Sequence, residues 1–122
     1  MPHKIAIVED DRSIADMYAF KLGHSGFLVQ VARNGVEGLE MIKAFRPDLI
    51  LLDLKMPIMP GDEMLEQLRS HEWGTEIKVI ILTNISKDEA PHKLRFLNVE
   101  RYIVKAHYTP SQVMAVIKEV LP

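Results

Sequence analysis

The sequence predicts an α/β protein in which five short strands form a parallel, doubly wound sheet and alternate with five helices. Apolar runs recur along the chain, and several lack the polar alternation of a half-exposed strand, as expected when helices cover both faces of a sheet. Each run is followed by a segment with apolar residues at helical spacing. The 122 residues can enclose one core but not two, so we expect a single domain over residues 1–122.

We expect the strands at residues 4–8, 27–32, 49–52, 77–82 and 102–104. The first, third and fourth runs are the most apolar and should lie at the centre of the sheet. Gln30 interrupts the second run and the fifth run is short, so these two strands are predicted at the edges.

Three helices are marked by apolar stripes and by residues that start or stop a helix. The first stripe contains Ile14, Met17, Tyr18 and Leu22, and Gly23 and Gly26 stand at its end. Asn34 and Glu37 resemble a capping box for the second helix, which Pro47 ends. Met64, Leu65 and Leu68 form the third stripe.

The last two predicted helices differ in strength. Ser86 and Glu89 suggest a capping box for a fourth helix that continues through Leu94 and Leu97, but Pro91 lies near its start. This helix has the fewest apolar anchors, and we expect it to be the loosest element. Thr109, Pro110 and Gln112 mark the start of the fifth helix.

Composition excludes several classes of function. The formal net charge is −2 and the basic residues are scattered, so no basic stripe is available for direct binding of nucleic acid. The chain has no cysteine, which excludes disulfides and thiol catalysis. Its start does not fit an ordinary signal peptide, and no run approaches the roughly 18 apolar residues of a membrane span. We expect a soluble, cytoplasmic protein that does not contact a membrane.

Polar residues with complementary chemistry stand where the predicted strands end. These residues are Glu9, Asp10, Asp53, Thr83 and Lys105. The carboxyl ends of parallel strands meet in one crevice, where three carboxylates favour a hard divalent cation, most naturally Mg²⁺. The metal and the Lys105 ammonium would attract a phosphoryl group, and Thr83 could hydrogen-bond one of its oxygens. Asp53 would then act as the nucleophile and form an aspartyl phosphate.

With these residues in place, the whole chain resembles the receiver domains of two-component response regulators. The resemblance rests on the Glu9–Asp10 pair, the stretch DLKMPIMPG that begins at Asp53, Thr83 after VIIL, and Lys105 after YIV. Pro57 and Gly61 match the loop that follows the phosphoacceptor strand in this family. The resemblance implies a flavodoxin-like fold with the strand order 2-1-3-4-5.

The resemblance also implies a role for each matching residue. Asp53 corresponds to the phosphoacceptor, Asp10 to a direct Mg²⁺ ligand and Glu9 to a ligand that acts through water. The backbone carbonyl of Lys55 would be the third protein ligand.

Four positions are implied in binding the phosphoryl group and in responding to it. Thr83 and Lys105 would bind the group together with the backbone N–H groups of Lys55 and Asn84. Tyr102 matches the switch aromatic whose rotamer follows Thr83, although the same tyrosine could equally be a packed edge-strand residue.

Two positions depart from the family pattern. Ala106 follows Lys105 where the family usually has a proline in a cis peptide, and we expect a trans bond here because a cis bond without proline costs about 2.5–4 kcal/mol. Lys55 and Asn84 flank the path of the water that would hydrolyse the phosphoryl group, which leaves the lifetime of the modified state open.

The leading hypothesis is a phosphoryl-operated switch. A sensor histidine kinase or a phosphotransfer protein would donate to Asp53, and a downstream protein or domain would bind the face of the fourth helix, fifth strand and fifth helix. The domain would catalyse its own phosphorylation and dephosphorylation without being an enzyme in the usual sense. Homodimerisation on phosphorylation, the cognate partners, and whether the chain acts alone or within a longer regulator stay open.

Two other hypotheses are weighed against the switch. An aspartate-nucleophile phosphatase commonly needs a second acid two residues after the nucleophile, where this chain has Lys55. A degenerate receiver that only binds partners would not need the complete set of acids, Thr83 and Lys105.

Overall fold

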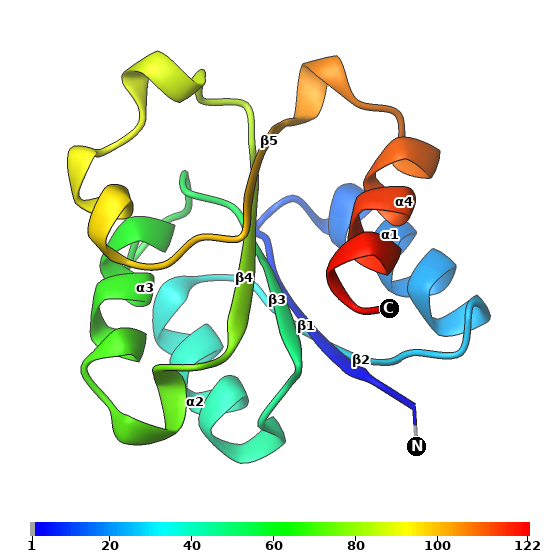
Figure 1. Ribbon diagram of the computed structural model, residues 1–122, viewed down its shortest axis with the longest axis horizontal. Helices are drawn as coiled ribbons and strands as arrows, with labels where there is room; N and C mark the ends of the chain where they lie inside the picture. Colours follow the sequence, from blue (N-terminus) through cyan, green and yellow to red (C-terminus); the bar gives the residue numbers. More distant parts are fainter. Residues whose placement is uncertain (1) are drawn as a thin grey trace.

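The computed structural model describes residues 2–122 as a five-stranded parallel sheet between two layers of helices (Figure 1). The strands are β1 (Lys4–Val8), β2 (Leu28–Ala32), β3 (Leu49–Leu52), β4 (Lys78–Thr83) and β5 (Arg101–Val104). Their order is β2-β1-β3-β4-β5, which confirms the predicted order and both predicted edge strands. Predicted and observed strand ends differ by no more than one residue.

Within residues 2–122, four α-helices and four short 3₁₀ helices accompany the strands, and the last of each follows β5. The α-helices are α1 (Arg12–His24), α2 (Gly35–Phe45), α3 (Gly61–Arg69) and α4 (Pro110–Val120). The 3₁₀ helices are η1 (Glu72–Gly74), η2 (Lys87–Glu89), η3 (His92–Phe96) and η4 (Lys105–His107). Within residues 2–122 no helix is long and apolar enough to cross a membrane.

The central strands bury alternate residues in two separate cores. Ile7 and Leu51 pack with α1 and α4 on one face, whereas Ala6 and Ile50 pack with α2 and α3 on the other. Figure 1 shows α1 and α4 together on one side of the sheet, and α2, α3 and the η2–η3 segment on the other. Burial on both faces explains why β1, β3 and β4 are continuous apolar runs.

The predicted fourth α-helix is wrong, because the chain forms η2 and η3 in its place. Pro91 has no N–H group and disfavours helical geometry in the residue before it, and Ala90 is indeed extended, with φ −66° and ψ 147°. The expected capping box is also absent, since the Ser86 hydroxyl donates to the Glu89 carboxylate (3.0 Å) and no side chain caps η2. Ala90 and Leu94 still pack against the core, so the apolar pattern was satisfied without an α-helix.

Two helix starts follow the sequence signals. The Asn34 side chain accepts a hydrogen bond from the Glu37 N–H (2.9 Å) and donates to the Glu37 carboxylate (2.8 Å), so half of a capping box forms there. Thr109 and Gln112 form the complete reciprocal box at the start of α4.

Arg69 fixes the connection that leads into β5, a role that no sequence signal indicated. Its guanidinium donates to the carbonyls of Leu97 (2.9 Å), Gly74 (2.7 Å), Ile77 (2.8 Å) and Asn98 (2.9 Å). One side chain thereby joins α3, η1 and the end of η3.

Gly61 begins α3 against the backbone of Asp53, and its N–H donates to the Leu54 carbonyl at 2.9 Å. A Cβ atom at Gly61 would lie 2.1 Å from the Asp53 carbonyl oxygen, whereas a Cβ atom at Gly23, within α1, would meet nothing within 4 Å. The close approach of α3 to the Asp53 loop therefore requires glycine at position 61.

We predict opposite effects for alanine at these two glycines. Gly61→Ala should lower the free energy of unfolding by about 1–3 kcal/mol, because backbone must move to admit the methyl group. Gly23→Ala should raise it by up to about 1 kcal/mol, since alanine favours a helix more than glycine does. Urea unfolding followed by circular dichroism measures both. Equal stability of Gly61→Ala and the wild type would contradict the described packing of α3 on the Asp53 loop.

Candidate functional site

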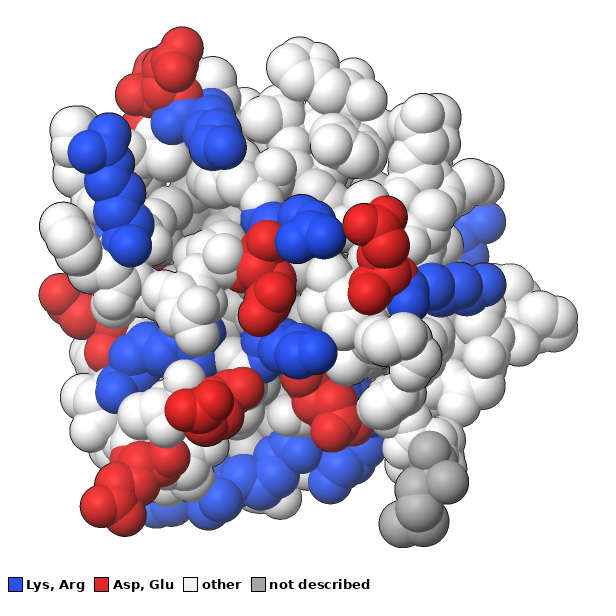
Figure 2. Space-filling view, in the orientation of Figure 1, with Lys and Arg blue, Asp and Glu red and all other residues white. Residues whose placement is uncertain are grey.

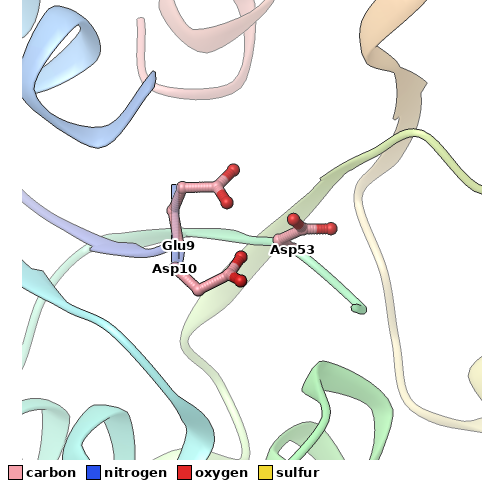
Figure 3. Close-up of side chains that lie close together, drawn as sticks. All are labelled: Glu9, Asp10 and Asp53. Atoms are coloured by element: carbon pink, nitrogen blue, oxygen red, sulfur yellow. The ribbon is translucent and has the colours of Figure 1, made fainter. Parts of the chain in front are cut away.

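Three carboxylates gather at the carboxyl edge of the sheet. Carboxylate oxygens of Glu9, Asp10 and Asp53 all lie within 4.8 Å of one another. Glu9 and Asp10 directly follow β1, and Asp53 directly follows the neighbouring strand β3, whose last residue Leu52 pairs with Val8 (Figure 3). Glu9 and Asp53 are buried, whereas Asp10 is exposed, so the cluster is open to solvent on the Asp10 side.

Lys105 provides the cation of this cluster. Its ammonium lies 2.5 Å from a Glu9 carboxylate oxygen and 3.1 Å from an Asp53 carboxylate oxygen. Lys105 follows the edge strand β5, so its side chain crosses the end of β4 to reach β3 and β1. The structure thus brings together four of the residues that the sequence placed at strand ends.

Burial dominates the titration of the cluster. It raises the pKa of Glu9 to about 7, and the Asp53 charge acts in the same direction, although the hydrogen bond from Lys105 opposes both effects. Burial alone would lower the pKa of Lys105, but its hydrogen bonds and charge interactions with the two carboxylates raise it overall. Lys105 therefore stays charged at neutral pH, and its single positive charge does not balance three carboxylates.

Backbone N–H groups add donors to the cluster. The Lys55 N–H donates to one Asp53 carboxylate oxygen at 3.3 Å, and the Asp11 N–H donates to Glu9 at 3.1 Å. The Lys55 side chain is exposed, as is Asn84 on the opposite loop. The Lys55 carbonyl as a metal ligand, and the Lys55 and Asn84 N–H groups as phosphate donors, stay predictions.

Thr83 and Tyr102 share a backbone neighbour that sequence analysis missed. The buried Thr83 hydroxyl accepts a hydrogen bond from the Ile85 N–H at 3.4 Å, and the Tyr102 hydroxyl donates to the Ile85 carbonyl at 2.7 Å. Burial and the Asp53 charge both raise the pKa of Tyr102, so its hydroxyl stays protonated and able to donate. The two side chains are connected through one residue, and nothing in the sequence distinguishes Ile85 from an ordinary apolar residue.

The peptide bond between Lys105 and Ala106 is trans, as expected, since residues 2–122 contain no cis peptide. Lys105 begins the 3₁₀ turn η4, in which the Tyr108 N–H lies 3.4 Å from the Lys105 carbonyl. Lys105 therefore reaches the carboxylates without the following proline that is expected from the family resemblance.

The donor set fits a hard divalent cation. The carboxylates supply only oxygen ligands, and the exposed side of the cluster leaves room for the waters that Mg²⁺ keeps when it binds to proteins. The three carboxylates can carry more negative charge than the single positive charge of Lys105, which contacts Glu9 and Asp53, can neutralise.

Comparison with known proteins agrees with this architecture. The family model for the response regulator receiver domain matches residues 5–118. The response regulator MprA of Mycobacterium ulcerans is 40% identical over 83 residues, which cover 68% of this chain and 35% of that protein. This chain thus spans about a third of the length of the curated relatives it matches.

Solved structures show the same fold over nearly the entire chain. The chemotaxis response regulator CheY4 of Vibrio cholerae superposes with a TM-score of 0.89 and 25% identity, covering 98% of this chain and 99% of that chain. The BeF3-activated N-terminal receiver domain of Klebsiella pneumoniae RstA gives a TM-score of 0.84 and 29% identity, covering 97% of both chains. With the strand order, the acidic pocket and the match over residues 5–118, the chain belongs to the response regulator receiver domain family of two-component systems.

Proposed function

We propose that this chain is a phosphoryl-accepting signalling switch in which Asp53 is the phosphoacceptor. The observation that supports this most directly is the contact of Asp53 with Lys105 beside Glu9 and Asp10. A carboxylate oxygen of Asp53 attacks the phosphorus, the bond from phosphorus to a histidine nitrogen of a sensor kinase or phosphotransfer protein breaks, and that nitrogen keeps the electron pair. The chain accelerates its own phosphorylation and dephosphorylation, but it passes the signal on by binding a partner protein or domain.

Mg²⁺ fits this function as the cofactor. Asp10, Asp53 and the Lys55 carbonyl would hold it directly, and Glu9 would hold it through water. When bound, the metal supplies positive charge to the phosphoryl oxygens as the donor approaches. Lys105 then exchanges a carboxylate partner for a phosphoryl oxygen, which keeps its ammonium paired throughout.

The hydrogen bonds at Ile85 offer a route from phosphorylation to the protein surface. The Thr83 hydroxyl oxygen accepts from the Ile85 N–H and its own proton is free to bind a phosphoryl oxygen, so a shift of Thr83 toward that oxygen would be felt at Ile85, to which Tyr102 is also hydrogen-bonded. The adjoining segment consists of η2 and η3, whose short 3₁₀ turns make fewer regular hydrogen bonds than an α-helix. A change at Thr83 can therefore shift this segment at low cost.

We propose that the downstream partner binds a surface formed by η2, η3, β5 and α4. A groove of about 640 Å³ runs along it, lined by residues of η2 and η3 and by Tyr102. Figure 2 shows acidic and basic side chains interspersed over the upper part of the view, where η2, η3 and β5 lie, whereas the continuous row of basic side chains runs along the lower edge. This mixture suits a protein partner, either a downstream domain or a second copy after phosphorylation, better than nucleic acid. Signalling of this kind would take place in the cytoplasm.

A phosphatase is a weaker candidate than a switch. The position two residues after Asp53 carries the exposed Lys55, so the acid that would protonate a leaving group there is missing.

Phosphorylation at Asp53 has a direct test. Incubation with Mg²⁺ and a small phosphodonor such as phosphoramidate should add the mass of one phosphoryl group to the intact chain. The added mass should be absent from Asp53→Asn and present in Asp48→Asn, whose exposed carboxylate binds the Lys4 N–H far from the site. An unchanged wild-type mass with several donors would overturn the proposed function.

Beryllofluoride distinguishes a working switch from a degenerate receiver. We expect binding that requires Mg²⁺ and is lost in Asp53→Asn, because the carboxylate oxygen is the ligand that completes the phosphoryl mimic. Chemical-shift changes at Thr83, Ile85 and Tyr102 in NMR spectra should accompany binding. Spectra that do not respond to Mg²⁺ and beryllofluoride would favour a degenerate receiver.

The raised pKa of Glu9 predicts how stability depends on pH in the metal-free chain. The folded state holds a proton on Glu9 up to about pH 7, while the unfolded chain releases it near 4.5. The folded state thus binds more protons between these values, so this residue lowers stability as pH rises, by an upper limit of about 3 kcal/mol.

Glu9→Gln lacks this titration and is the matched variant. In EDTA, the wild type should gain stability relative to Glu9→Gln as the pH falls from 8 to 5, measured by urea unfolding at each pH. A difference that stays flat, or that grows with rising pH, would show that Glu9 is ionised in the folded chain throughout this range.

A further inference from the structure

The loop from Asp53 to Gly61 carries the proposed phosphoacceptor and ends at the start of α3. Met56 is buried in the core on the α2 and α3 side of the sheet, and Met59 packs against the same core. Inside the loop the Lys55 N–H donates to an Asp53 carboxylate oxygen at 3.3 Å. The direction of the Asp53 carboxylate therefore depends on the path that the loop backbone takes.

The turn at Ile58 in this loop is strained. Ile58 has a φ of 70°, and the N–H of the next residue, Met59, donates to the carbonyl of the preceding Pro57 at 2.7 Å. A turn that closes across a single residue with positive φ is rare and strained, and a β-branched residue is especially ill suited to it. The Ile58 side chain is 79% exposed, so its own contacts do little to offset this cost. Such a conformation persists only where the surrounding structure imposes it.

Gly35, the first residue of α2, holds the loop directly after this turn. Its N–H donates to the Met59 carbonyl at 3.1 Å. A Cβ atom at position 35 would lie 2.7 Å from both the carbonyl oxygen and the Cγ atom of Met59. Gly35 does not have a positive φ, so the contact requires the absence of a side chain and not a special backbone conformation.

The start of α2 is better fixed than the loop that it contacts. Asn34 caps the helix through hydrogen bonds with Glu37 at 2.9 Å and 2.8 Å, and Gly35 itself is buried. The turn at Ile58, in contrast, is exposed and strained. An added side chain at position 35 would therefore displace Met59 and the loop and leave the helix in place.

The loop is thus held at two points, one from each neighbouring helix. Gly61 of α3 fixes it through the hydrogen bond to Leu54, and Gly35 of α2 fixes it through Met59. The segment between these points includes the strained turn at Ile58, so loss of the contact with Gly35 would let the turn relax.

We propose that Gly35 is a positioning residue for metal binding and phosphoryl transfer, which acts through Met59 and keeps the Lys55 backbone against the Asp53 carboxylate. Gly35 touches neither the metal nor the reacting atoms. Because the Asp53 carboxylate is both the proposed nucleophile and a proposed Mg²⁺ ligand, a loop that leaves this path should weaken metal binding and slow phosphorylation. This inference rests on the proposed function.

Gly35→Ala tests this role, with Gly38→Ala as the matched control in the same helix. Mg²⁺ affinity, measured by calorimetry without a phosphodonor, should fall about tenfold in Gly35→Ala, the lower end of the loss expected when a residue that orients a metal ligand is replaced. The nearest atoms to a Cβ at Gly38 would be side-chain atoms of Met64, at 2.9 Å, and Val8, at 3.1 Å, so Gly38→Ala should keep the wild-type Mg²⁺ affinity. Equal affinities of Gly35→Ala and the wild type would overturn the inference.

A second substitution separates positioning from a general loss of structure. Glycine adopts positive φ without the cost that isoleucine has, so Ile58→Gly favours the loop path that Gly35 normally holds. Ile58→Gly should therefore recover part of the Mg²⁺ affinity lost in Gly35→Ala. If the double variant binds Mg²⁺ no better than Gly35→Ala, the loss does not come through the loop and the inference is wrong.

Hydrogen exchange in the wild type provides a measurement that needs no substitution. If Mg²⁺ binds the loop on this path, the metal must by linkage stabilise the hydrogen bond from Gly35 to Met59. Exchange of the Gly35 N–H should then slow on addition of Mg²⁺, and more than that of the Gly38 N–H, which donates to the Asn34 carbonyl within the helix at 2.9 Å. Equal slowing of the two amides would contradict the proposal.

Phosphoramidate distinguishes failure of this inference from failure of the proposed function. At one Mg²⁺ concentration below saturation, the wild type and Gly38→Ala should be phosphorylated at the same rate and Gly35→Ala more slowly. An unreactive wild type would overturn the proposed function, whereas equal rates for Gly35→Ala and a reactive wild type would overturn only the inference.

Discussion

The structure depends on an imbalance of charge at the carboxyl edge of the sheet, where three carboxylates lie together and two of them, Glu9 and Asp53, contact the Lys105 ammonium. Two of the carboxylates follow strands that are buried on both faces, so they lie where an unpaired charge is costly. Lys105 offsets part of this cost from the edge strand, and the rest leaves Glu9 with a pKa of about 7. The same imbalance makes the carboxylate cluster compatible with a divalent cation.

Most of the fold was predictable because the apolar pattern of each segment agrees with the way that segment is buried in the folded sheet. Helices on both faces make the central strands continuous apolar runs, and these gave strand limits within one residue of those observed. The segment after β4 is the exception. Its apolar spacing suggested an α-helix, but Pro91 sets the geometry of Ala90, and the spacing is satisfied by two 3₁₀ turns. Local backbone chemistry outweighed periodicity there.

The site was predictable to the level of which residues meet, but not how they pair. In a parallel sheet, residues that end neighbouring strands must converge, so Glu9, Asp53 and Lys105 could be grouped from strand ends alone. The preference of Lys105 for contact with Glu9 as well as Asp53 depends on side-chain reach across β4, which no motif encodes. Ile85 was missed because an apolar loop residue carries no chemical signature.

Strand alternation divides the site between the two faces of the sheet. Thr83, the last residue of β4, shares its face with Ile81, in the core that also holds Tyr102, whereas Ile103 of β5 packs in the core on the other face. The hydrogen bond from Tyr102 to Ile85 lies in the layer of η2 and η3, on the face of the sheet opposite α1. If the proposed switch acts through Thr83 and Tyr102, its first effect should therefore fall on the layer of η2 and η3 and not on the layer of α1, because the sheet separates the two cores.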